Sequence, residues 1–161
     1  MAFIKKKEVE QFRVFALELN SFVEDPFKQE YSEAITPELA AILGGVGTGV
    51  LGISTIFTWL SGMSGAQIMA ALASFGFGGA VGGIATLTAS VAVPVVLVAG
   101  GFYTVANQRK LKQELIKLFR FVKNLEPKLV DDERSKVQEL LKSIDLTMVE
   151  LGKRYKISKV K

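Results

Sequence analysis

The sequence predicts an all-α membrane protein, in which a hydrophobic helical hairpin and a third hydrophobic helix are flanked by amphipathic helices. Residues 39–108 contain no Asp, Glu, Lys or Arg, and about twenty apolar residues already suffice for a helix to cross a bilayer. The flanking segments, residues 1–38 and 109–161, carry all the charge. Their apolar residues recur at helical spacing, which is typical of amphipathic helices.

The two flanking segments differ in charge. Residues 1–38 have five basic and eight acidic side chains, and residues 109–161 have fifteen basic and eight acidic ones. With a mean hydropathy of +0.32, this pattern favours anionic lipid over nucleic acid as a partner. The chain has no Cys and no His, which excludes disulfides, thiolate or histidine catalysis and an ordinary zinc site. We therefore expect no enzyme, no cofactor and no metal.

The N-terminal arm, residues 1–38, is expected to begin with an amphipathic helix. Its apolar seam consists of Val9, Phe12, Ala16, Leu19 and Val23. Asp25-Pro26 should end this helix, because proline disfavours helix in the residue before it. A short helical piece is expected over Phe27–Ala34. The first helix either packs in a small bundle or lies on the membrane interface.

Three helices are expected in the hydrophobic region, over about 39–60, 66–87 and 90–108. Thr36-Pro37-Glu38 favours a helix start, with an N-cap, a first-turn proline and an acidic first turn. The first helix would be about 33 Å long, which is enough to span, and Trp59 near its end suits the lipid interface. Ser61–Gly65 is typical of a tight hairpin turn. Two spans with a longer second helix are the alternative.

Small residues recur at every fourth position along the first two of these helices. Such rows let helix backbones approach closely in lipid, within the hairpin or between copies. The candidate packing residues are Gly45, Gly49, Gly52, Ala70, Ser74, Gly78, Gly79, Gly82 and Gly83. Residues 47–52 also match G-x-G-x-x-G, but no acidic residue follows until Glu114, so nucleotide binding is not expected.

The C-terminal arm, residues 109–161, is expected to form two amphipathic helices and a basic tail. Glu126-Pro127 should end the first helix, and Gly152 should cap the second. The second helix has a heptad seam, which could pack on the N-terminal arm or on another copy; its residues are Val137, Leu141, Ile144, Met148 and Leu151. The residues expected at the lipid interface are Trp59, Arg109, Lys110, Lys112, Lys153, Arg154 and Lys156. Basic residues after a span mark the cytoplasmic side if the protein is inserted during synthesis.

The uncharged hairpin around Ser61–Gly65 and the small-residue rows beside it, flanked by amphipathic helices, resemble a known layout. Pore-forming colicin domains, apolipoprotein L and α-helical pore-forming toxins have this layout, and the resemblance covers the whole chain as an architecture. It implies a glycine-zipper protein that self-associates in a bilayer of anionic lipid. Such a protein forms a pore or permeabilises the membrane, as a bacterial toxin or cell-death effector does.

Two other functions remain open. A membrane anchor or scaffold would bind a partner protein through the seam around residues 141–151, without leakage. A bundle that hides the hairpin until it is triggered would be soluble before insertion. In each case the expected location is a membrane, other copies of the chain are expected partners, and nucleic acid is not.

Overall fold

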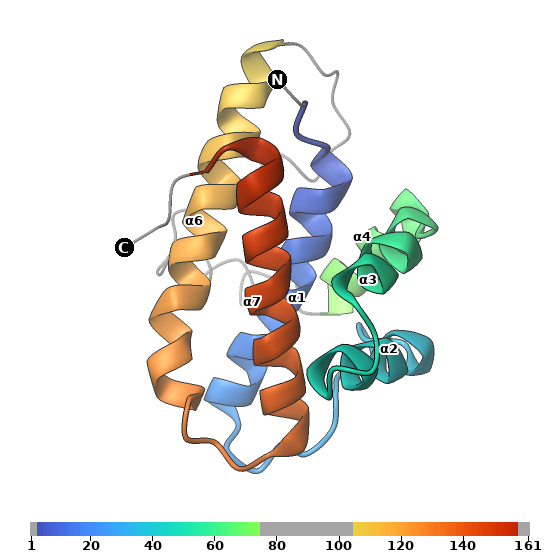
Figure 1. The fold of residues 1–161 in the computed structure, drawn as a ribbon, viewed down its shortest axis with the longest axis vertical. Helices are drawn as coiled ribbons and strands as arrows, with labels where there is room; N and C mark the ends of the chain where they lie inside the picture. The colour runs from blue at the N-terminus through green and yellow to red at the C-terminus, as the bar shows by residue number, and fades with distance from the viewer. Residues whose placement is uncertain (1–2, 75–104, 158–161) are drawn as a thin grey trace.

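The computed structural model describes residues 3–74 and 105–157, and every regular element within these ranges is a helix. Three long amphipathic helices form a bundle: α1 (Lys6–Glu24), α6 (Val105–Leu129) and α7 (Ser135–Tyr155). In Figure 1 they run side by side along the long axis of the molecule.

Three short helices lie on one side of this bundle (Figure 1). They are α2 (Pro37–Gly47), α3 (Ile53–Ser61) and α4 (Gly65–Ser74). α2 packs mainly on α7, α3 contacts both α2 and α7, and α4 packs on α1. The short helices therefore form a second layer, and their buried side chains share one core with those of the bundle.

That core is apolar and rich in aromatic residues. It includes the buried side chains Phe12, Phe15, Leu19, Leu115, Leu118, Phe119, Val122, Val137, Ile144 and Leu151. The rings of Phe12 and Phe119 meet edge to face, with their centroids 5.3 Å apart, a favoured aromatic geometry. The heptad seam expected on the last helix is buried within the chain itself.

The prediction of a transmembrane hairpin is wrong. In the part of the chain that the structure describes, no helix combines the length and the apolar character needed to cross a membrane. The span expected over 39–60 is divided into α2, of 11 residues, and α3, of 9 residues. Each is about half the thickness of a bilayer core or less. The predicted helix over 66–87 is present as α4 up to Ser74. Residues 75–104, which include most of the helix predicted over 90–108, lie outside the described residues.

The break between α2 and α3 has a local cause. Gly49 has φ +83°, a left-handed conformation that glycine adopts without the steric cost a Cβ brings. The chain then folds back, and the N–H of Leu51 donates to the carbonyl of Gly45 over 2.9 Å. The glycines that predict a close helix contact thus also permit a turn, which hydropathy alone does not reveal.

Several helix ends follow their local signals. α1 ends at Glu24, directly before Asp25-Pro26. Thr36 caps α2, and its hydroxyl accepts the N–H of Leu39 over 3.3 Å. The prediction of a helical piece over Phe27–Ala34 is wrong, because that stretch has only turns, a bend and irregular backbone.

Two other expected helix ends are also wrong. α6 runs through Pro127 to Leu129; Leu125 and Leu129 are both buried, so another turn of packing offsets the hydrogen bond that proline cannot donate. α7 passes Gly152 and ends at Tyr155, followed by Lys156 with φ 50°. Tyr155 is buried, which gives the last turn a reason to form.

Candidate functional site

The candidate site is the interface between the short helices and the three-helix bundle. α3, α4 and the part of α2 after Glu38 have no charged residue. We call the side chains that they bury the docked face; it consists of Leu39, Leu43, Val46, Ile56, Leu60, Ile68 and Ala71. An uncharged unit is thus held on a charged bundle by one apolar face.

α2 crosses α7 at close range through small residues. A Cβ built on Gly47 would lie 2.8 Å from the Cα of Glu139, whereas one built on Gly44 would lie 3.6 Å from the Glu139 carboxylate. One turn further along α7, the buried hydroxyl of Ser143 donates to the carbonyl of Leu43 over 3.4 Å. Glycine at position 47 therefore lets the two helix backbones approach each other.

α3 has polar partners at its C-terminal end, although it has no charge of its own. The Nζ of Lys7 donates to the carbonyl of Ser61 over 2.9 Å, and Nε2 of Gln11 donates to the carbonyl of Leu60 over 2.5 Å. These two α1 side chains add donors at the end of a helix, where carbonyls lack intrahelical partners; the carbonyl of Leu60 also accepts the N–H of Met63 over 3.1 Å. The guanidinium of Arg154 lies 4.7 Å from the ring centre of Phe57, at cation–π distance.

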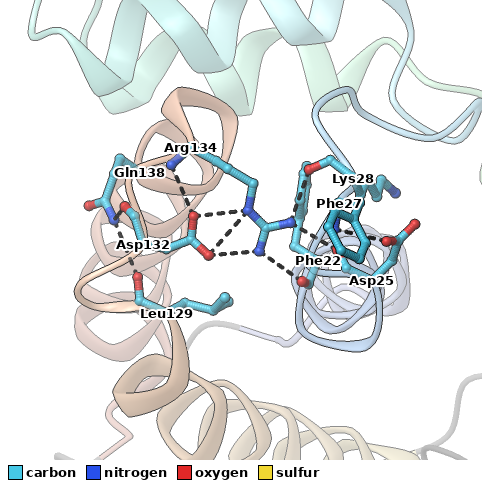
Figure 2. Close-up of polar contacts among 8 residues, drawn as sticks. All are labelled: Phe22, Asp25, Phe27, Lys28, Leu129, Asp132, Arg134 and Gln138. Atoms are coloured by element: carbon cyan, nitrogen blue, oxygen red, sulfur yellow. Dashed lines mark hydrogen bonds and ion pairs between the residues drawn. The ribbon is translucent and has the colours of Figure 1, made fainter.

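Arg134 holds the segment that leads from α1 to α2 (Figure 2). Its guanidinium donates to the carbonyls of Phe22, Asp25 and Lys28, each over 2.9 Å, and to the carboxylate of Asp132 over 2.7 Å. The hydrogen bonds that Arg134 donates to the Asp132 carboxylate hold the pKa of Asp132 below its ordinary value. One arginine thus ties the α6–α7 turn to the end of α1.

A second set of contacts fixes the same segment nearer to α2. The carboxylate of Glu18, fully buried on α1, accepts the N–H and the hydroxyl of Ser32 and pairs with Nζ of Lys28 at 2.9 Å. The hydroxyl of Tyr31 donates to the carbonyl of Lys136 on α7 over 3.1 Å. The segment before α2 is therefore fastened to both α1 and α7.

The candidate packing glycines have different positions from one another in the structure. A Cβ on Gly45 would collide with the side chain of Leu51, so this glycine serves the fold-back after α2. Gly49 is the left-handed turn residue with no neighbour near its Cβ position, and Gly52 precedes α3 as its N-cap. Gly47 was not among the predicted packing residues, because the residues four positions before and after it are Leu43 and Leu51, so it belongs to no row of small residues.

The other candidate packing residues make no described contact that supports a packing role. Ala70 is exposed on α4, and Ser74 is the last residue of that helix. The remaining four, Gly78, Gly79, Gly82 and Gly83, lie outside the described residues, and their packing role stays a prediction.

The residues expected at a lipid interface fall into two groups. Trp59 is half-buried and packs against the core. The basic ones gather at one end of the bundle, since Nζ of Lys112 donates to the carbonyl of Lys156 over 3.2 Å. Arg154 pairs with Glu8 of α1 at 2.9 Å. Segments far apart in sequence thus meet at this end.

The fold and site together define a three-helix bundle that carries an uncharged helical unit on its side. No protein-family model matches the chain, and no curated protein or solved structure is significantly similar to it. Within residues 3–74 and 105–157, no group of three acidic side chains is placed to hold a metal ion. The most distinctive feature of the described structure is therefore the docked face, by which the uncharged unit packs on α1 and α7.

Proposed function

We propose that the chain is a membrane-inserting protein, in which the bundle holds the uncharged unit until a bilayer offers its docked face another apolar environment. The observation that carries this proposal is that the unit is uncharged beyond Glu38 and packs through one apolar face on one side of the three-helix bundle. The turn between α2 and α3 is also uncharged, and the side chain of Val50 in this turn is 80% exposed.

The energetics favour such a transfer over release into water. The docked face has six large aliphatic side chains, and exposing each to water costs about 1.5–3 kcal/mol. The sum is on the order of the whole stability of a typical domain, roughly 5–15 kcal/mol, so in water the unit stays docked. Lipid tails solvate the unit's side chains about as well as a protein core does, so in a bilayer the unit's own part of this cost is largely absent.

Self-association is the second part of the proposal. When α2 leaves α7, the positions at which Gly44 and Gly47 now face Glu139 become free. Small residues on a helix surface suit close packing against another helix in lipid. Copies of α2 that pack in this way would assemble and permeabilise the bilayer.

Trp59, the single tryptophan of the chain, provides a direct test because it lies on α3. Vesicles containing lipids brominated deep in the acyl chains should quench its fluorescence and, in parallel samples, release an encapsulated dye. Trp59→Phe combined with Asn124→Trp moves the reporter to an exposed position on α6. That control should release dye without quenching. If Trp59 is not quenched and no dye escapes, the proposal fails.

A further inference from the structure

We infer that one end of the bundle is a docking surface for the head groups of an anionic bilayer. This inference deepens the proposed function and rests on it only for the choice of a bilayer as partner. The surface is formed by the starts of α1 and α6 and the end of α7, which meet at the same end of the long axis (Figure 1).

Hydrogen bonds hold these three segments together. The side chain of Gln108 pairs with the backbone of Ile4 in both directions, over 2.7 and 3.1 Å. Lys112 reaches the carbonyl of Lys156. The docking surface is therefore a defined part of the fold, and its charges have fixed neighbours.

The charge on this end is strongly positive. Its exposed basic residues are Lys5, Arg109, Lys110, Lys153 and Lys156. The acidic side chains nearby already have partners: Glu8 and Glu150 both bind Arg154, Glu8 also accepts the hydroxyl of Tyr155, and Glu10 pairs with Lys6 at 3.4 Å. They therefore neutralise little of the exposed positive charge.

The opposite end differs in sign. The end of α1 and the α6–α7 turn expose Glu24, Asp25, Asp131 and Glu133, against the exposed Lys128 in the last turn of α6. A molecule with such opposite ends is oriented by a negative surface, with its basic end facing the lipid.

Phe3 distinguishes a bilayer from other anionic partners. Its ring is 69% exposed beside the basic residues of α1. A ring in such a position can enter the interface below the head groups, whereas the phosphates of a nucleic-acid duplex offer it no apolar environment. The uncharged part of the sequence also ends here, at Gln108, so docking would hold the end of this apolar stretch against lipid.

Co-flotation with vesicles tests the surface separately from insertion. The triple variant Arg109→Gln/Lys110→Gln/Lys153→Gln should bind phosphatidylserine-containing vesicles at least about tenfold more weakly than the wild type, since each basic residue near such a surface contributes a severalfold gain. A matched control, Arg120→Gln/Lys128→Gln/Lys142→Gln, removes the same charge from exposed positions elsewhere. It should lose at most about threefold. Phe3→Ser should weaken binding to the same vesicles by about tenfold. Purely zwitterionic vesicles should bind the wild type and all of these variants weakly.

The outcomes separate this inference from the proposed function. Equal losses in the two triple variants, or unchanged binding in the first, would overturn the docking surface even if dye release persists. Charge-dependent binding without dye release would support the surface and contradict the insertion. A loss of binding to duplex DNA that exceeds the loss for vesicles, at the same salt concentration, would assign the surface to nucleic acid and overturn the inference.

Discussion

Gly47 of α2 lies so close to Glu139 of α7 that a Cβ at position 47 would be 2.8 Å from the Glu139 Cα. Real Cβ atoms essentially never come this close to a backbone atom. The contact joins the uncharged unit to the bundle through two backbones, and no flexible side chain lies between them to adjust. A single methyl group added at position 47 should therefore disturb the packing of α2 on α7.

Gly47→Ala should therefore weaken the packing of α2 on α7. We expect a loss of about 1–3 kcal/mol in the free energy of unfolding, the usual cost of overpacking, measured by urea denaturation. Gly44→Ala is the matched control, because its Cβ would make an ordinary contact at 3.6 Å. That control should be neutral or stabilising, since alanine is the better helix former. Equal losses in the two variants would show that α2 does not cross α7 here.

Arg134 should be among the most sensitive positions of the described surface. Arg134→Lys keeps the charge, but one ammonium nitrogen cannot occupy the positions of both guanidinium nitrogens that reach the three carbonyls. We expect a loss of about 2–4 kcal/mol from these charge-assisted hydrogen bonds. Thermal unfolding measures it. Arg120→Lys, at an exposed position on α6, should change the stability by less than about 0.5 kcal/mol. If Arg134→Lys left the stability unchanged, the hydrogen bonds of Arg134 to the three carbonyls would not contribute to the fold.

Arg13 and Glu114 form a buried ion pair between α1 and α6, with 3.3 Å between nitrogen and oxygen. Burial raises the pKa of Glu114 and lowers that of Arg13, so the surroundings penalise both charges. Arg13→Met alone leaves a buried carboxylate and should cost about 3–5 kcal/mol. Adding Glu114→Leu should recover most of that loss. A double variant as unstable as the sum of the single ones would show that each residue acts independently.

Asp145 on α7 gives the fold a defined pH response. Partial desolvation and the neighbouring Glu126 raise its pKa to about 6 from 3.8, against the lowering effect of Lys123. Because the pKa of Asp145 is higher in the folded state than in the unfolded state, folding favours its protonated form. The stability that protonated Asp145 contributes is therefore complete below about pH 4 and is lost as the pH rises through 6. Asp145→Asn should therefore lose less stability than the wild type between pH 4 and pH 8 in urea titrations. Asp131→Asn, in the exposed α6–α7 turn, is the control and should follow the wild type.

Local chemistry explains which parts of the fold could be predicted from the sequence. The seam of α1, the Thr36 cap and the apolar face of α7 depend on residues within a few positions of one another, and periodicity identifies such features. The docking of residues 39–60 on the bundle depends instead on tertiary packing, because hydropathy does not distinguish an apolar helix in lipid from one that packs on a neighbouring bundle. The turn at Gly49 is local, but glycine also suits close helix packing, so its presence alone does not predict the turn.

The site was less predictable for a related reason. Gly47 is significant only because Glu139, 92 positions later, lies against it, and Arg134 only because three carbonyls of a distant segment converge on it. Neither relationship leaves a local pattern. The basic residues of the C-terminal arm were identifiable by composition, but their meeting with Phe3 and Lys5 required the three-dimensional arrangement.

Release of α2 from α7 is the central step of the proposed function, and a reversible cross-link tests it directly. The chain has no cysteine, and a Cβ at Gly47 would lie 3.1 Å from that of Glu139. A shift of a few tenths of an ångström gives the usual disulfide separation. In Gly47→Cys/Glu139→Cys, we predict dye release from anionic vesicles when the protein is reduced, no release when it is oxidised, and recovery on adding dithiothreitol. If the oxidised protein, with the disulfide confirmed by mass, releases dye as fast as the reduced form, then insertion does not require α2 to leave α7.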